Sequence, residues 1–288
     1  MTKNNYMVLK KDTIWFLILR MEVNIMDSKG KDMRKQVEKM YSKIAKEEAE
    51  SCFPTSSCCE KDFSSAEYAE KLGYSPEDIL SLPEGANMGL GCGNPQAIAS
   101  LKPGEMVLDL GSGGGLDCFL ASGKVGEEGK IIGVDMTAEM LEKARKNAKQ
   151  GNYQNVEFRL GEIENLPVAD NTVNVIISNC VVNLSTNKPR VFEEMFRVLK
   201  PGGRVAMTDM VATSPIPDIF LDDPELYSSC ITGASLIPDL KEMLAAAGFQ
   251  DIKITAKEES RDFIKDWTET LKAEDYVVSA SIEAKKPL

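Results

Sequence analysis

Short apolar runs alternate with amphipathic stretches from residue 106 onward. The runs are unbroken and lie between charged or glycine-containing segments, which is typical of strands buried on both faces of a sheet. The predicted strands cover 106–110, 130–134, 156–160, 173–178 and 204–208. Apolar residues at helical spacing predict helices over 116–122, 138–150 and 188–199. This strand–helix–strand repetition favours a parallel, doubly wound α/β sheet.

The C-terminal region continues the pattern and then changes it. Residues 238–247 predict a helix that ends at Gly248, and residues 252–256 predict a further strand. Residues 275–283 (DYVVSASIE) alternate with period two, which predicts an antiparallel strand at the edge of the sheet. The complete sheet is therefore expected to be mostly parallel and seven-stranded.

The N-terminal part is organised differently. Residues 1–30 predict a poorly ordered lead-in, and apolar residues at three- and four-residue steps predict an amphipathic helix over 31–50. A loop rich in Cys, Ser and Pro follows at 51–59, and Ser75 with Pro76 predicts the start of a short helix. We divide the chain into a lead-in (1–30), a helical segment with a Cys-bearing loop (31–100), a central core (101–212) and a region that completes the sheet (213–288).

Composition and charge narrow the chemistry. The 288 residues carry 34 Lys+Arg against 45 Asp+Glu, and the net charge of −11 argues against nucleic acid as a partner. There is no histidine, which excludes Ser-His-Asp and Cys-His nucleophile pairs and every His-containing metal site. The longest uncharged apolar run near the start, 14–19, is too short to span a membrane. Seven cysteines, an odd number, favour a reducing cytoplasm over a disulfide framework.

A glycine-rich loop follows the first strand of the core, in the segment 109–115 (DLGSGGG). A dinucleotide-binding loop would read G-x-G-x-x-G, but the last position is Leu116 when counted from Gly111 and Cys118 when counted from Gly113. The pattern instead suits S-adenosylmethionine (SAM), which has no pyrophosphate, and it disfavours a nicotinamide-dependent dehydrogenase. An acid at Asp109 would repel phosphate but can orient an ammonium group.

Further acidic residues follow the next two strands. Asp135 ends the second strand, where a carboxylate can bind both ribose hydroxyls, and Ile163 and Glu164 follow the third strand, where they can contact adenine. Asp135 could instead only cap the next helix, and Glu164 could be a solvated loop acid. The predicted cofactor-binding residues are Asp109, Gly111, Ser112, Gly113, Gly115, Asp135, Met136, Ile163, Glu164 and Asn179.

Several thiols come from separate segments that the predicted topology brings to one edge of the sheet. Cys180 follows the fourth strand directly, and Cys230 lies in the connection after the fifth strand. Cys58 and Cys59 lie on the loop before the core. Three thiols can thus converge near one methyl donor, whereas Cys92 and Cys118 are interpreted as packing residues, and no C-x-x-C pair indicates a zinc site.

Five segments, taken together, closely resemble arsenite SAM methyltransferases of the microbial kind. They are 84–95 (EGANMGLGCGNP), 108–115 (LDLGSGGG), 133–137 (GVDMT), 178–185 (SNCVVNLS) and 230–234 (CITGA), and the resemblance runs from about residue 31 to the end. It implies a Rossmann-like class I methyltransferase fold, with a SAM-binding core and a C-terminal arsenite-binding region.

The resemblance also implies As(III), delivered as a thiol conjugate, held by three thiolates and methylated stepwise. Two ligands correspond to Cys180 and Cys230, and the third to Cys58, with Cys59 as the alternative. Since methylation oxidises arsenic, the family further implies a thiol reductant of the thioredoxin or glutathione type.

The chemistry agrees with the composition. Arsenic is soft and prefers sulfur ligands, its lone pair is the nucleophile, and the sulfonium methyl is already an activated electrophile. No general base is needed, so the absence of histidine is no obstacle. Two alternatives stay open at this point: a small-molecule C- or O-methyltransferase of the quinone-precursor type, and a metalloid-binding sensor that uses SAM only as a ligand.

Overall fold

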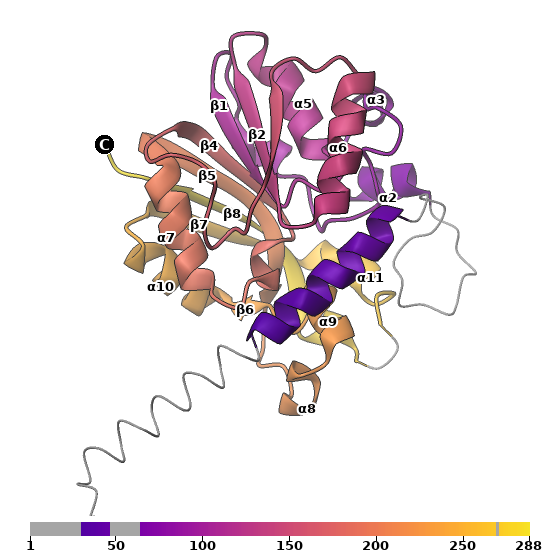
Figure 1. Ribbon diagram of the computed structural model, residues 1–288. Helices are drawn as coiled ribbons and strands as arrows, with labels where there is room; N and C mark the ends of the chain where they lie inside the picture. Colours follow the sequence, from indigo (N-terminus) through magenta and orange to yellow (C-terminus); the bar gives the residue numbers. More distant parts are fainter. Residues whose placement is uncertain (1–29, 47–63, 269–270) are drawn as a thin grey trace, which may run out of the picture.

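The computed structural model describes residues 30–46, 64–268 and 271–288 (Figure 1). Its centre is one sheet in the order β3-β2-β1-β4-β5-β8-β7, with a short β6 paired to β5. The strands are β1 (Met106–Leu110), β2 (Lys130–Asp135), β3 (Val156–Leu160), β4 (Val173–Asn179), β5 (Leu199–Ala212), β6 (Ser235–Leu236), β7 (Gln250–Lys257) and β8 (Val277–Lys285). The first five strands are parallel to one another. The doubly wound, mostly parallel prediction is confirmed, with the two-residue β6 as an addition to the seven strands.

The position of β8 differs from the prediction. It is antiparallel, as expected, but it pairs with both β5 and β7 and so lies inside the sheet, which makes β7 the edge strand. Two of the alternating polar positions, Ser279 and Ser281, are small and buried, and the Ser279 hydroxyl donates to the Cys92 carbonyl oxygen at 2.7 Å. In the sequence, such buried serines have the same pattern as a solvent-facing set, which is why the edge assignment was wrong.

Helices cover both faces of the sheet (Figure 1). On one face, Phe119 of α5 (Leu116–Val125) and Leu141 of α6 (Ala138–Gln150) pack against Val107 and Ile177 of the sheet. On the other face, Phe192 of α7 (Lys188–Val198) and Leu244 of α10 (Ile237–Ala246) pack in a second core. The helices are α2 (Ser65–Lys71), α3 (Pro76–Leu80), α4 (Gln96–Ala99), α5 (Leu116–Val125), α6 (Ala138–Gln150), α7 (Lys188–Val198), α8 (Asp218–Leu221), α9 (Pro224–Ser228), α10 (Ile237–Ala246) and α11 (Arg261–Ile264), with 3-10 turns at Val182–Leu184, Glu258–Ser260 and Ala273–Asp275.

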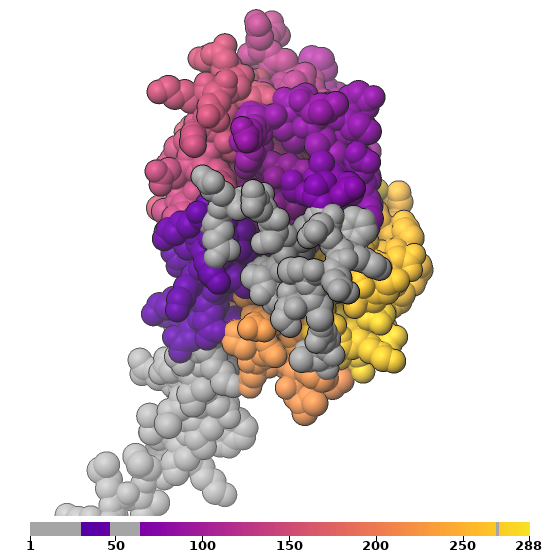
Figure 2. Space-filling model, turned by 90° about the vertical axis from the view of Figure 1, so that its right-hand side faces the viewer, coloured from indigo at the N-terminus to yellow at the C-terminus, as the bar shows by residue number. Residues whose placement is uncertain are grey.

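An N-terminal helix over residues 30–46 precedes these elements and is called the N-terminal helix below. The sequence predicts it over 31–50, and its last predicted residues lie outside the described ranges. Figure 2 shows this helix, in indigo, lying lengthwise against the body of the molecule. Ser75 accepts a hydrogen bond from the Asp78 backbone N–H and Pro76 opens α3, as predicted. Across the described ranges, no helix combines the length and the apolarity needed to cross a membrane.

Candidate functional site

A pocket opens at the carboxyl ends of β1, β2 and β4, where strand order reverses between β1 and β4. It encloses about 1250 Å³ of empty space, counted out into its open mouth. Its walls come from the glycine-rich loop, the segment 86–91, the N-terminal helix and the segment 228–230. Open parallel sheets bind their ligands at this reversal point.

The glycine-rich loop shapes one wall through its backbone. The N–H groups of Gly111 and Ser112 both donate to the Val134 carbonyl oxygen, at 2.8 and 3.1 Å, which ties the loop to β2. Gly111 has a φ of 69°, and a Cβ there would lie 2.6 Å from the Val181 side chain. Gly115 does not line the pocket; it turns the chain into α5 with a φ of 98°, against Phe119. Ser112 and Gly113 line the pocket with Gly111, as the sequence suggests.

Asp135 joins this loop to the start of α6. Its carboxylate accepts hydrogen bonds from the backbone N–H groups of Gly113, at 2.9 Å, and Thr137, at 2.8 Å. Burial raises its pKa, and the backbone hydrogen bonds oppose that rise. Asp135 therefore bonds the N-terminal end of α6 and also lines the pocket beside Met136, so the capping interaction leaves it at the pocket wall and its contact with ribose stays a prediction.

A second group of carboxylates lies deeper in the pocket. Asp109 is buried, accepts a hydrogen bond from the Cys118 thiol at 3.2 Å, and has a strongly raised pKa because of burial and then of Asp117. Burial also raises the pKa of Asp117 to about 6, although the Tyr74 hydroxyl donates to it at 3.0 Å. Burial disfavours the ionised form of both acids, so a positively charged ligand group beside them would stabilise their carboxylates.

Asn179 lines the pocket, but its side-chain amide is hydrogen-bonded to other groups of the protein. Its oxygen accepts from the Cys92 backbone N–H at 3.0 Å and from the Thr208 hydroxyl at 3.1 Å, and its nitrogen donates to the Gly93 carbonyl at 2.7 Å. The side chain thereby fixes the segment that carries Cys92 against the end of β4 and against Thr208 within β5.

Ile163 and Glu164 lie on the pocket wall after β3, as expected. The Glu164 carboxylate accepts from the Ser185 hydroxyl at 2.6 Å and from Arg34 at 3.2 Å. Its side chain is only 12% exposed, so the interpretation as a solvated loop acid is wrong.

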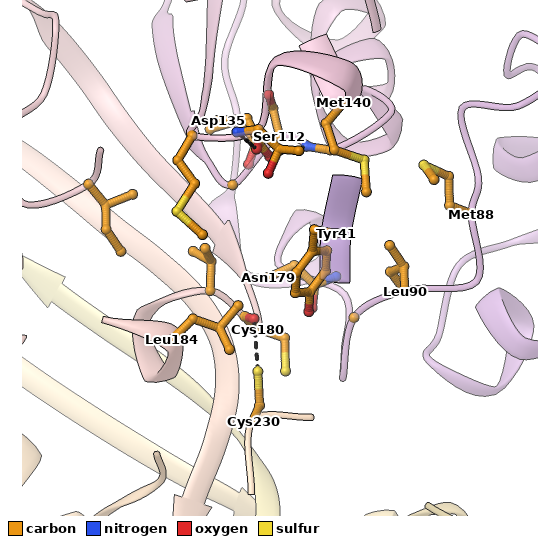
Figure 3. Close-up of a pocket in the computed structure, with 18 of the residues that line it drawn as sticks. Tyr41, Met88, Leu90, Ser112, Asp135, Met140, Asn179, Cys180, Leu184 and Cys230 are labelled. Carbon is orange, nitrogen blue, oxygen red and sulfur yellow. Dashed lines mark hydrogen bonds between the residues drawn. The ribbon is translucent and has the colours of Figure 1, made fainter. Parts of the chain in front are cut away.

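The two thiols predicted to meet do so on the opposite side of the pocket (Figure 3). Cys180 and Cys230 have φ angles of 58° and 60°, the left-handed region that non-glycine residues rarely adopt. The Cys230 Sγ donates to the Cys180 carbonyl oxygen at 3.2 Å. Hydrogen bonds with Cys230 and Cys92, followed by burial, raise the pKa of Cys180 well above its usual value. Strained backbone at two such residues is typical of a functional site.

Cys92 is a third thiol at this place. Its Sγ, the Cys180 Sγ and a carboxylate oxygen of Asp209 lie within 4.8 Å of one another, and Cys92 is 1% exposed. The sequence interpretation as packing alone is therefore incomplete. Cys58 and Cys59, the residues predicted for the third ligand, lie outside the described residues.

Comparison with known proteins agrees with this geometry. A family profile described as "Methyltransferase domain" matches residues 101–248. An arsenite methyltransferase of Halobacterium salinarum is 50% identical over 92% of this chain and 70% of its own length. One of Aquipseudomonas alcaligenes is 36% identical over 77% of this chain and 63% of its own length. The chain belongs to the arsenite methyltransferase family.

A solved structure supports the same assignment to the family. The arsenic(III) S-adenosylmethionine methyltransferase of Chlamydomonas reinhardtii matches with a TM-score of 0.57 and 30% identity, over 77% of this chain and 73% of that one. The chain thus spans about two thirds of the length of the family members it matches.

Sequence reasoning did not identify several residues that line the pocket. They include Arg34, Tyr41, Met88, Leu90, Asp117, Ser228, Ser229 and Trp267. One local signal existed for Asp117, since an acid in the first turn of a helix directly after a glycine-rich loop lies beside any ligand bound there. No local signal exists for Tyr41 or Trp267, whose position depends on how distant segments pack.

Proposed function

We propose that this chain is an arsenite methyltransferase that moves a methyl group from SAM to As(III) bound by Cys180 and Cys230. One observation carries the proposal: two thiols from separate segments meet across a pocket from the glycine-rich loop and Asp135. A methyl donor on one side and a thiophilic acceptor on the other would share that pocket.

The acidic side of the pocket suits SAM. Asp135 would bind the ribose hydroxyls, Ile163 and Glu164 would contact adenine, and Asp109 would orient the ammonium-bearing methionine end. SAM carries an ammonium and a sulfonium. The buried carboxylates of Asp109 and Asp117 and the partly buried carboxylate of Asp135 would face that charge from β1, α5 and β2. Met136, Ser112 and Gly113 complete the proposed site, and Gly111, Gly115 and Asn179 act through the loops they hold.

The thiol side suits arsenite. Each As–S bond forms as a thiol proton and an arsenite hydroxyl leave together as water, so a raised thiol pKa does not prevent binding. The arsenic lone pair then forms the As–C bond while the S–CH3 bond breaks, and the electron pair of that bond stays on sulfur in S-adenosylhomocysteine. The protein positions the two partners in line.

Arsenic loses two electrons in this step, and a thiol reductant of the thioredoxin or glutathione class would return them. A reducing cytoplasm fits that requirement and the thiol content of the chain. The third sulfur is either Cys58, with Cys59 as its alternative, as the resemblance implies, or Cys92, which lies beside Cys180. Soft As(III) prefers sulfur to the carboxylate of Asp209.

Replacement of the thiols tests the proposal. Cys180→Ser and Cys230→Ser should each lower arsenite methylation by about two orders of magnitude, because an alcohol is a poor ligand for a soft acceptor. The assay follows methylated arsenicals and S-adenosylhomocysteine with SAM and a thiol reductant present. Cys118→Ser is the matched control, since this buried thiol lies outside the pocket lining and serine keeps a donor to Asp109.

Two results would contradict the proposal. Full arsenite methylation by both variants would show that Cys180 and Cys230 do not bind the acceptor. Binding of arsenite and SAM without any product would point to a sensor.

A further inference from the structure

Tyr41 lines the pocket from the N-terminal helix, beside the place where the two proposed ligand sites meet. Val37 and Ala45, one turn before and one turn after it, are buried on the same face of that helix. In Figure 3 the Tyr41 ring lies between Ser112, Asp135 and Met140 on one side and the thiols on the other.

The ring spans the pocket from the N-terminal helix toward α9. Its hydroxyl donates to the Ser228 carbonyl oxygen, two residues before Cys230, at 3.4 Å. That distance is long for an O–H···O hydrogen bond, so the hydroxyl contributes little to holding the ring. Tyr41 also packs against the buried cluster that contains Cys92, Cys230 and Trp267.

The electrostatic surroundings keep this side chain neutral. Burial raises the pKa of Tyr41 well above 10.0, and the charges of Cys230, Cys180, Asp135 and Asp209 raise it further. Asp135 is on the cofactor side and the thiols are on the acceptor side, so Tyr41 is close to both. A neutral ring here offers a face to a cation without adding charge.

Contacts along the N-terminal helix fix where the ring can be. Arg34 pairs with Glu162 at 2.7 Å and with Glu164 at 3.2 Å, on the loop after β3. Further along, Lys46 pairs with Glu139 of α6 at 2.7 Å, and the Ser42 hydroxyl donates to the same carboxylate. The helix is thus attached on both sides of Tyr41 to segments that bound the cofactor pocket.

We infer that Tyr41 is a positioning residue whose ring faces the sulfonium of SAM from the wall of the pocket and leaves the line from the methyl group to the thiols open. This inference rests on the proposed function for its choice of ligand. Aromatic rings attract cations at their faces, most strongly where water is excluded. The ring therefore favours SAM, which carries the sulfonium charge, over S-adenosylhomocysteine, which lacks it.

The ratio of the two affinities tests the inference. Calorimetric titration of Tyr41→Leu should show SAM binding weakened about tenfold more than S-adenosylhomocysteine binding. Tyr41→Phe keeps the ring and should keep the wild-type ratio. Val37→Ala loosens the same helix without touching the pocket lining and should change both affinities equally. Tyr41→Met replaces the leucine variant if the latter does not fold.

Two outcomes overturn the inference. Equal losses for the two ligands in Tyr41→Leu, including no loss at all, would leave the ring with a packing role only. A phenylalanine variant that matches the leucine variant would assign the effect to the hydroxyl. The titrations contain no arsenic, so their result stands apart from the test of Cys180 and Cys230, which concerns the acceptor.

Discussion

The two sides of the pocket are built in different ways. Most of the cofactor side consists of backbone N–H groups, glycines and carboxylates within one stretch, from Asp109 to Met140, to which the loop after β3 adds Ile163 and Glu164. The thiol side joins three segments, at Cys92, Cys180 and Cys230, and the backbone is strained at Cys180 and Cys230. A local sequence pattern can specify the first side, whereas the second exists only once the sheet has formed. A substitution on one side should therefore weaken binding of the ligand on that side and leave binding on the other side unchanged.

The largest difference between the loss of SAM affinity and the loss of arsenite affinity is expected from Asp135→Asn. Asp135 accepts hydrogen bonds from the Gly113 and Thr137 N–H groups, and the asparagine amide would face these two donors. The variant would also lose the charge-assisted hydrogen bonds proposed for the ribose hydroxyls. SAM affinity should fall about 100-fold, since hydrogen bonds to a charged group contribute about 1.5–3 kcal/mol each. Calorimetry measures SAM binding, and tryptophan fluorescence follows arsenite binding without SAM. An equal loss of arsenite affinity would show that the two sides are not separate.

A smaller effect, confined to the thiol side, is expected from Cys92→Ser. If Cys92 supplies the third sulfur, arsenite affinity should fall about tenfold, or about 1.4 kcal/mol, while SAM affinity stays unchanged. Cys58→Ser is the paired variant, because the resemblance assigns the third ligand there. Loss of affinity in the Cys58 variant with none in the Cys92 variant would place the third sulfur on the loop instead.

The difference between the two sides also explains what the sequence predicted. The strands, the glycine-rich loop and Asp135 follow from local apolar runs and turn residues, and the structure shows them where they were expected. The role of Cys92 did not follow, because a buried cysteine flanked by glycines has the same local pattern whether it packs or binds. The interior position of β8 was missed for a related reason: only the tertiary fold decides whether Ser279 meets water or the Cys92 carbonyl. Tyr41 depends on the docking of a distant helix.

The smallest expected effect is a change in Tm, and it distinguishes two buried acids whose pKa values are raised to the same extent. Burial raises the pKa of Asp117, on the cofactor side, and of Asp209, on the thiol side, from 3.8 to about 6. A raised pKa means that the folded state binds more protons than the unfolded chain between about pH 4 and pH 6. Each acid therefore lowers stability as the pH rises through that window, and the loss persists above it.

The hydrogen-bond donors around the two acids should make their replacement by asparagine change the Tm in opposite directions at pH 7.5. Asp117 accepts from the Tyr74 hydroxyl, and an asparagine oxygen can do the same, so Asp117→Asn should raise the Tm by a few degrees at pH 7.5 and by nothing at pH 4. Asp209 accepts from the backbone N–H groups of Val182, Asn183 and Met210, which an asparagine cannot all satisfy. Asp209→Asn should therefore lower the Tm at both pH values. Thermal unfolding of the ligand-free proteins measures both Tm values. A Tm change of the same sign in both variants at pH 7.5 would contradict the prediction. It would show that burial alone decides the effect, and not the donors around each acid.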